Sequence, residues 1–71
     1  MKLIDLIRLS NARFYALEIY DSNGQRSELD IDMERDGEKL MLAKYAQAEV
    51  VRIQPIINND TEPALEVQLY V

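Results

Sequence analysis

The chain has 71 residues and a formal net charge of −5, and it contains neither cysteine nor histidine. These values exclude disulfides, thiolate metal sites and a histidine general base, and they argue against direct nucleic-acid binding, which depends on cationic neutralisation of phosphate. The hydrophobic fraction of 48% predicts one small folded domain over residues 1–71. No apolar run reaches membrane-spanning length and no signal-peptide pattern opens the chain, so we expect a cytoplasmic protein without membrane association.

The first two elements are a short helix and a strand. Residues 2–9 place Leu3, Leu6 and Ile7 at helical spacing, which predicts an amphipathic helix. So short a helix is unstable alone in water and must be docked on the rest of the protein. Residues 13–20 then predict a strand whose alternate side chains form two rows.

The stretch Asp21-Ser22-Asn23-Gly24 predicts the turn after this strand. A two-residue loop would place Leu17 opposite Asp30, whereas a three-residue loop pairs Leu17 with Leu29. Aspartate at the first position and glycine at the fourth suit a type I turn followed by a left-handed residue. We therefore expect a hairpin with a three-residue loop.

Residues 29–42 predict a second hairpin. Apolar and acidic residues alternate from Leu29 to Glu34, and Asp36-Gly37 is a preferred two-residue type I′ turn. In that register Met33 faces Leu40 across the pair. The first three strands would then form an antiparallel meander with the acidic strand at its centre.

A helix is the rival interpretation of part of this region. Residues 38–48 are rich in good helix formers, and Asp36 could cap a helix there. A mixed outcome is a strand to Ala43 followed by a helical turn at residues 45–47.

Two further strands are predicted, at residues 49–57 and 65–71. Pro55 cannot donate a ladder hydrogen bond, so the first of them is an edge strand or carries a bulge. The last has no charged residue after Glu66, which predicts an unguarded apolar edge.

The fold class is therefore α+β, with an N-terminal helix packed on an antiparallel β-meander sheet of about five strands. An offset of 36 residues superposes Leu17 on Ile53 and Leu29 on Leu65 with few identities, which leaves open an alternative of two helix–hairpin (αββ) units. The predicted core consists of Leu3, Leu6, Ile7, Tyr15, Leu17, Ile19, Leu29, Ile31, Met33, Leu40, Leu42, Val51, Ile53, Leu65, Val67 and Leu69.

No residue pattern predicts a catalytic, cofactor or metal site. A carboxylate pair such as Asp30 and Asp32 needs an enclosing pocket to separate its pKa values. The EF-hand pattern fails because Arg35 falls at the position of its turn glycine. Alternate carboxylates on a strand also lie about 6.6 Å apart, too far for easy shared coordination. We therefore expect a protein that is not an enzyme and carries no cofactor.

Acidic residues gather in one stretch, since six of the 13 lie between Glu28 and Glu38. They either keep the domain soluble and protect an edge, or form a docking face for a basic partner. Exposed apolar residues on the same face favour a partner or self-contact. The possible partner-binding residues are Glu28, Asp30, Asp32, Glu34, Phe14, Tyr20 and Met41.

The expected function is a non-enzymatic protein–protein interaction module with an acidic sheet face as docking surface. A domain this small without staples often gains stability by self-association, so we expect a homodimer formed through the sheet face or the final strand. The alternative is a small acidic inhibitor or nucleic-acid mimic that occupies a basic groove on a target protein.

Overall fold

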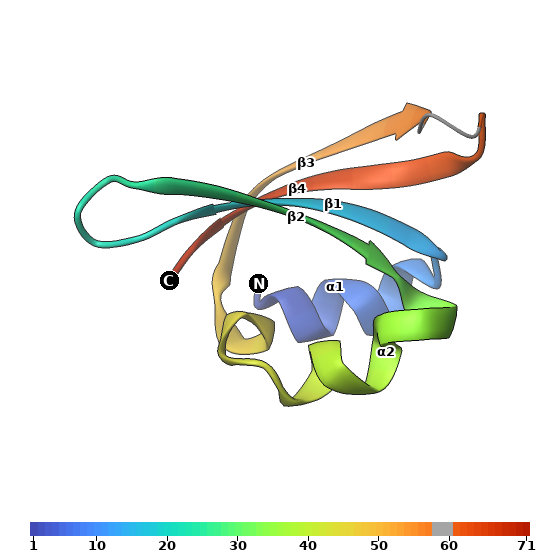
Figure 1. Cartoon of the computed structure of the whole chain (residues 1–71), viewed down its shortest axis with the longest axis horizontal. Helices are drawn as coiled ribbons and strands as arrows, with labels where there is room; N and C mark the ends of the chain where they lie inside the picture. The colour runs from blue at the N-terminus through green and yellow to red at the C-terminus, as the bar shows by residue number, and fades with distance from the viewer. Residues whose placement is uncertain (58–60) are drawn as a thin grey trace.

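The computed structural model describes residues 1–57 and 61–71, with positions 41 and 42 described for the backbone alone. Its elements are α1 (Leu3–Ser10), β1 (Phe14–Tyr20), β2 (Arg26–Asp32), α2 (Met33–Leu42), the 3₁₀ turn η1 (Lys44–Gln47), β3 (Glu49–Ile57) and β4 (Pro63–Tyr70). Figure 1 shows two layers, with both helices on one side of the sheet and no described element on the other side. The chain is α+β with its N-terminal helix packed on the sheet, as predicted. In the described ranges no helix is both long and apolar enough to cross a membrane.

The sheet of the described chain has four strands in the order β2-β1-β4-β3 and is mixed. The two hairpins are antiparallel, but β1 runs parallel to β4 at the centre. The predicted antiparallel meander of about five strands is therefore wrong. The acidic strand β2 is an edge rather than the centre, and the final strand β4 is interior rather than an unguarded edge. The reason is the segment after β2, which leaves the sheet as a helix and carries the chain to the opposite edge.

Helix α1 forms as its apolar spacing predicts. Leu3, Leu6 and Ile7 are buried beneath the sheet. The helix ends at Asn11, which adopts the left-handed conformation with φ 51° and donates its N–H to the Ile7 carbonyl. Asparagine tolerates this backbone conformation better than most residues, which makes it a suitable C-cap.

The first hairpin has the predicted three-residue loop, and Leu17 pairs with Leu29. Asp21 Oδ1 accepts hydrogen bonds from the backbone N–H groups of Asn23 and Gln25, at 2.8 and 2.9 Å. Gly24 takes the left-handed position with φ +80°. The turn chemistry of the sequence therefore sets the register of β1 against β2.

The predicted second hairpin at Asp36-Gly37 is wrong, because Met33–Leu42 is the helix α2. Asp32 caps it by accepting a hydrogen bond from the Glu34 N–H at 3.0 Å, and Asp36 accepts one from the Asp32 N–H at 3.3 Å. Leu40, seven residues after Met33, is fully buried. The rival helix over residues 38–48 was closer, but α2 begins earlier and stops at Leu42, and the expected helical turn follows as η1.

The second hairpin of the structure joins β3 to β4. As Pro55 indicated, β3 is an edge strand, and it also carries an irregularity between Val50 and Arg52. The element order is helix, two strands, helix, two strands, which matches the alternative of two αββ units. The two hairpins nevertheless differ in register, since Ile53 pairs with Val67 rather than with Leu65.

The core lies between the sheet and the helices. Most of the predicted core residues are buried there or packed against the cluster, but Leu29 and Ile53 are exposed, because neither helix covers the outer parts of β2 and β3. Val51 is exposed because it is the extra residue at the irregularity of β3, where Val50 packs against the core in its place. The side chain of Leu42 is outside the described part of the chain. The buried members of the cluster are Leu3, Leu6, Ile7, Tyr15, Leu17, Ile31, Leu40, Ala48, Val67 and Leu69.

The two glycines offer a test of the helix at residues 33–42. We expect Gly37→Ala to raise the free energy of unfolding by about 0.5–1 kcal/mol, because alanine is the better helix former. A Cβ at this position meets only the flexible end of Met33, at 3.4 Å. Gly24→Ala should instead lower it by about 1 kcal/mol, because the residue sits at φ +80°. Urea denaturation measures both, and a destabilised Gly37→Ala variant would support a turn at residues 36–37 against the helix.

Candidate functional site

The side of the sheet away from the helices is here called the open face. Hydrogen-bond register places its side chains in rows that cross all four strands. The apolar row is Asp32, Phe14, Ala64 and Ile56, and the acidic row beside it is Asp30, Ala16, Glu66 and Gln54. The third row is Glu28, Glu18, Gln68 and Arg52, and beyond it Tyr20 lies beside Tyr70. The open face therefore changes from apolar to charged to aromatic along the strands.

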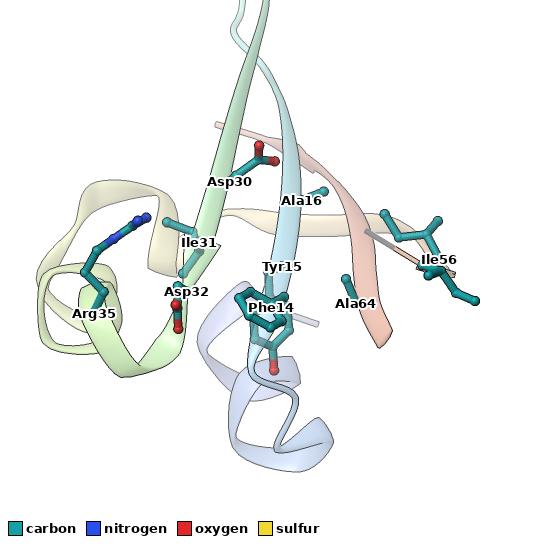
Figure 2. A pocket seen from close by; sticks show the side chains of 10 residues that line it. Phe14, Tyr15, Ala16, Asp30, Ile31, Asp32, Arg35, Ile56 and Ala64 are labelled. Carbon is teal, nitrogen blue, oxygen red and sulfur yellow. The ribbon is translucent and has the colours of Figure 1, made fainter. Parts of the chain in front are cut away.

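A shallow hollow of about 440 Å³ opens where the apolar and acidic rows meet. Figure 2 shows Phe14 and Ala16 on β1, Asp30 on β2, and Ala64 and Ile56 on the other two strands around it. The hollow exists because the two alanines are short while Phe14 and Ile56 stand above them on the strands. Its lining is part apolar and part polar, and the polar residues include Arg35 of α2 as well as Asp30 and Asp32. A depression that combines apolar side chains with a few polar groups is the usual form of a binding site.

Arg13 contacts two residues that line one end of the hollow, Phe14 and Asp32. Its guanidinium lies over the Phe14 ring at 4.7 Å and pairs with Asp32 at 3.3 Å and Glu34 at 3.2 Å. The hydrogen bond from Arg13 lowers the pKa of the Asp32 carboxyl, and the bond from the Glu34 N–H lowers it further. Asp32 is therefore occupied by its own chain and has little capacity left for a partner cation.

The third row is also occupied internally. Glu18 accepts a hydrogen bond from the Tyr20 hydroxyl and pairs with Arg26 at 3.2 Å. These contacts, with the Tyr20 bond the largest cause, lower the pKa of Glu18, and the same bond raises the pKa of Tyr20. The Tyr20 ring stacks on Tyr70 with centroids 5.4 Å apart. This end of the open face is thus a closed polar network beside an aromatic pair.

The structure brings together most of the predicted partner-binding residues. Phe14, Tyr20, Glu28, Asp30 and Asp32 all lie on the open face. Two others do not belong to it: Glu34 is in the first turn of α2, although it reaches Arg13, and Met41 is in α2 with its side chain outside the described part.

Sequence reasoning missed Ala16, Ala64 and Glu66 as residues of the site. They become neighbours of Asp30 and Phe14 only through the parallel pairing of β1 with β4. No local pattern signals that pairing, so only the alternation within each strand could have placed them on one face.

The residues that the structure describes contain no group of three or more acidic side chains placed to hold a metal ion. The hollow is also open to solvent rather than enclosed. An arrangement of this kind can bind complementary charge and apolar surface.

Comparison of the chain with models of known protein families, with curated proteins and with solved structures finds no match. Function must therefore be argued from the open face.

The Asp32 contacts give an expected dependence on pH. Because the folded-state pKa of Asp32 is lowered, the unfolded chain takes up protons first on acidification, and stability falls as pH drops below about 4. Asparagine is as good an N-cap as aspartate, so Asp32→Asn removes the charge and keeps the cap. We expect a lower melting temperature for this variant at pH 7 and a smaller difference from the parent as the pH falls below 4.

Glu38→Gln is the matched control, because Glu38 is exposed on α2 and makes no described ion pair. Its difference from the parent should stay small at both pH values. An Asp32→Asn variant that melts with the parent at pH 7 would show that the Arg13 contacts contribute nothing to stability.

Proposed function

We propose that the protein is a non-enzymatic interaction module that binds a basic segment of a partner protein on its open face. The observation that carries this proposal is the hollow where apolar side chains and carboxylates meet on a sheet face that no described helix covers. An apolar side chain of the partner supplies affinity because binding removes its surface from water. The surrounding carboxylates select a cationic partner and steer its approach.

Edge protection accounts for only part of the acidic surface. Glu28 and Asp30 lie on the edge strand β2, where charges oppose pairing with another chain. Glu18 and Glu66 lie on the interior strands β1 and β4, which have no free edge to guard. Glu18 stands opposite Glu28, but Arg26 pairs with both and offsets their repulsion. Glu66, an interior carboxylate without an ion pair among the described residues, supports a docking role.

A nucleic-acid mimic is the competing proposal, and the apolar row distinguishes the two. A mimic needs negative charge at phosphate-like spacing and makes no use of Phe14, Ala64 and Ile56. Ile56→Thr keeps a β-branched residue on the strand but removes apolar surface from the hollow. Binding of the partner should therefore weaken in Ile56→Thr if the protein is a docking module, and stay unchanged if it is a mimic.

A random peptide library displayed on phage tests the docking proposal, because the selection does not require an identified partner. We expect the selected peptides to be rich in lysine, arginine and large apolar residues. Asp30→Lys should weaken their binding by roughly tenfold or more in calorimetry, because it places like charge in the site. Glu38→Lys makes the same change in net charge on α2 and should leave binding nearly unchanged.

Two results would contradict the proposal. One is a set of selected peptides without excess positive charge. The other is equal loss of binding in Asp30→Lys and Glu38→Lys, which would mean that overall charge, and not the open face, decides the affinity.

Self-association is a second part of the proposal, and the structure changes the surface that it would use. The final strand is interior, and two open faces would bring carboxylates against carboxylates. On the helix side of β3, however, Ile53 is 43% exposed and Ile57 is 72% exposed. Exposed apolar side chains that are close together favour contact with a second copy.

Analytical ultracentrifugation tests this surface. We expect a dimer at high micromolar concentration, shifted toward monomer by Ile53→Lys. Gln54→Lys adds the same charge at the next position on the opposite side of β3 and should leave the dimer intact. A parent protein that is monomeric at high micromolar concentration would remove self-association from the proposal.

A further inference from the structure

We propose that the open face binds an extended segment of a partner protein that carries an arginine or lysine two residues from a large apolar residue. This inference rests on the proposed docking function and specifies the chemistry of the partner. The cation would lie over Ala16 between Asp30 and Glu66, and the apolar side chain would lie over Ala64 between Phe14 and Ile56.

The place of the cation follows from which carboxylates are already occupied. Asp32 is bound by Arg13, Glu18 by Tyr20 and Arg26, and Glu28 by Arg26. In contrast, Asp30 and Glu66 have no ion pair or hydrogen bond from the described side chains. The capacity of the open face to bind a new cation is therefore concentrated in the acidic row.

The acidic row also has room for a cation. Asp30, Ala16 and Glu66 are direct neighbours across three adjacent strands, so the two carboxylates flank a single methyl group. Their backbones are about 9.5 Å apart, twice the spacing between strands. A planar guanidinium over Ala16 can then meet a carboxylate on each side, and an ammonium group can approach either one.

The place of the apolar side chain follows from the neighbouring row. Phe14, Ala64 and Ile56 are direct neighbours across β1, β4 and β3, with the short Ala64 in the middle. The same hollow of about 440 Å³ is lined by these three residues and by Ala16 and Asp30. Glu66 lines a second hollow that shares Ala16 and Asp30 with the first, so the two subsites adjoin at these residues. Figure 2 shows the side chains of the first hollow, in which Phe14, Ala64 and Ile56 form the apolar subsite.

The distance between the rows selects an extended partner. Neighbouring rows on one sheet face lie about 6.6–7 Å apart along the strands. In an extended segment, residues two apart point to the same side and have this same separation, whereas adjacent residues point to opposite sides. A segment that lies along the strands can therefore fill both subsites with residues i and i+2.

Charge complementarity determines the kind of occupant. A second copy of this chain carries a net charge of −5 and would be repelled at the acidic row. Nucleic acid is repelled for the same reason. A basic, extended segment of a different protein is the occupant that both rows accept.

Three isomeric eight-residue peptides in a glycine, serine and threonine background test the inference by NMR titration of the labelled protein. Each carries one leucine and one arginine, placed two apart, adjacent, or four apart, which is the helical spacing. We expect the two-apart isomer to shift amides of β1, β4 and the inner half of β3, with a Kd on the order of 1 mM. The other two isomers should bind at least roughly fivefold more weakly, because each of them fills only one subsite at a time.

Paired variants of the protein complete the test. Asp30→Asn with Glu66→Gln should weaken the two-apart isomer by roughly tenfold, since the charge-assisted bonds are lost. Asp5→Asn with Glu38→Gln makes the same change in net charge on the helices and should have little effect. Asp30→Lys should reverse the preference, so that a peptide with glutamate in place of arginine binds more tightly. The NMR spectrum of each variant reports whether it is folded.

The results separate this inference from the proposed function. Equal binding of all three isomers, or shifts confined to the helix side, would overturn the inference. If library peptides bind the open face without the two-residue spacing, the docking function stands and this inference is wrong. If no basic peptide binds the open face, both fail.

Discussion

The parallel pairing of β1 with β4 is the constraint on which the rest of the structure depends. It puts the two strands at the centre of the sheet and joins Tyr15, Leu17 and Ile19 to Leu65, Val67 and Leu69 in the core. It also forces the chain to travel from the β2 edge to the β3 edge before it can return. That path carries α2 and η1 beneath the same face that α1 covers, and the other face is left without a layer in the described chain.

Local chemistry predicted the parts of the fold that are local. The α1 stripe, the three-residue loop at Gly24 and the edge position of the strand with Pro55 each follow from a few neighbouring residues. The error at residues 33–42 has a physical cause. Met33 and Leu40 are seven apart, which suits both two helical turns and a pair facing each other across a tight hairpin.

Burial and capping decided that choice in favour of the helix. Asp32 and Asp36 satisfy backbone donors at the start of α2, and the helix buries Leu40 completely. Part of the candidate site could be predicted from the sequence. Phe14, Glu28 and Asp30 lie on strands whose alternation of side chains is visible in the sequence. Glu66 and Ala16 were missed because their place beside Asp30 depends on a contact between distant segments.

The open face separates two uses of negative charge. At the aromatic end the carboxylates pair with Arg26, and Tyr20 donates a hydrogen bond to one of them, which makes that end part of the scaffold. Near the apolar row, Asp30 and Glu66 are left without such partners in the described chain. A sheet face that only had to remain hydrated would not need this division, because single charges of either sign would serve.

The central pairing also has a consequence for how the protein is made. Phe14 pairs with Ala64, and Tyr20 with Tyr70, so strands at opposite ends of the chain meet at the middle of the sheet. Closing so long a loop is unfavourable until the contacts that it permits are formed, and folds dominated by such contacts fold slowly. A growing chain on the ribosome can form α1 and the first hairpin, but it cannot complete its core until β4 has emerged. We therefore expect folding to follow synthesis, with the apolar faces of β1 and α1 exposed to chaperones in the interval.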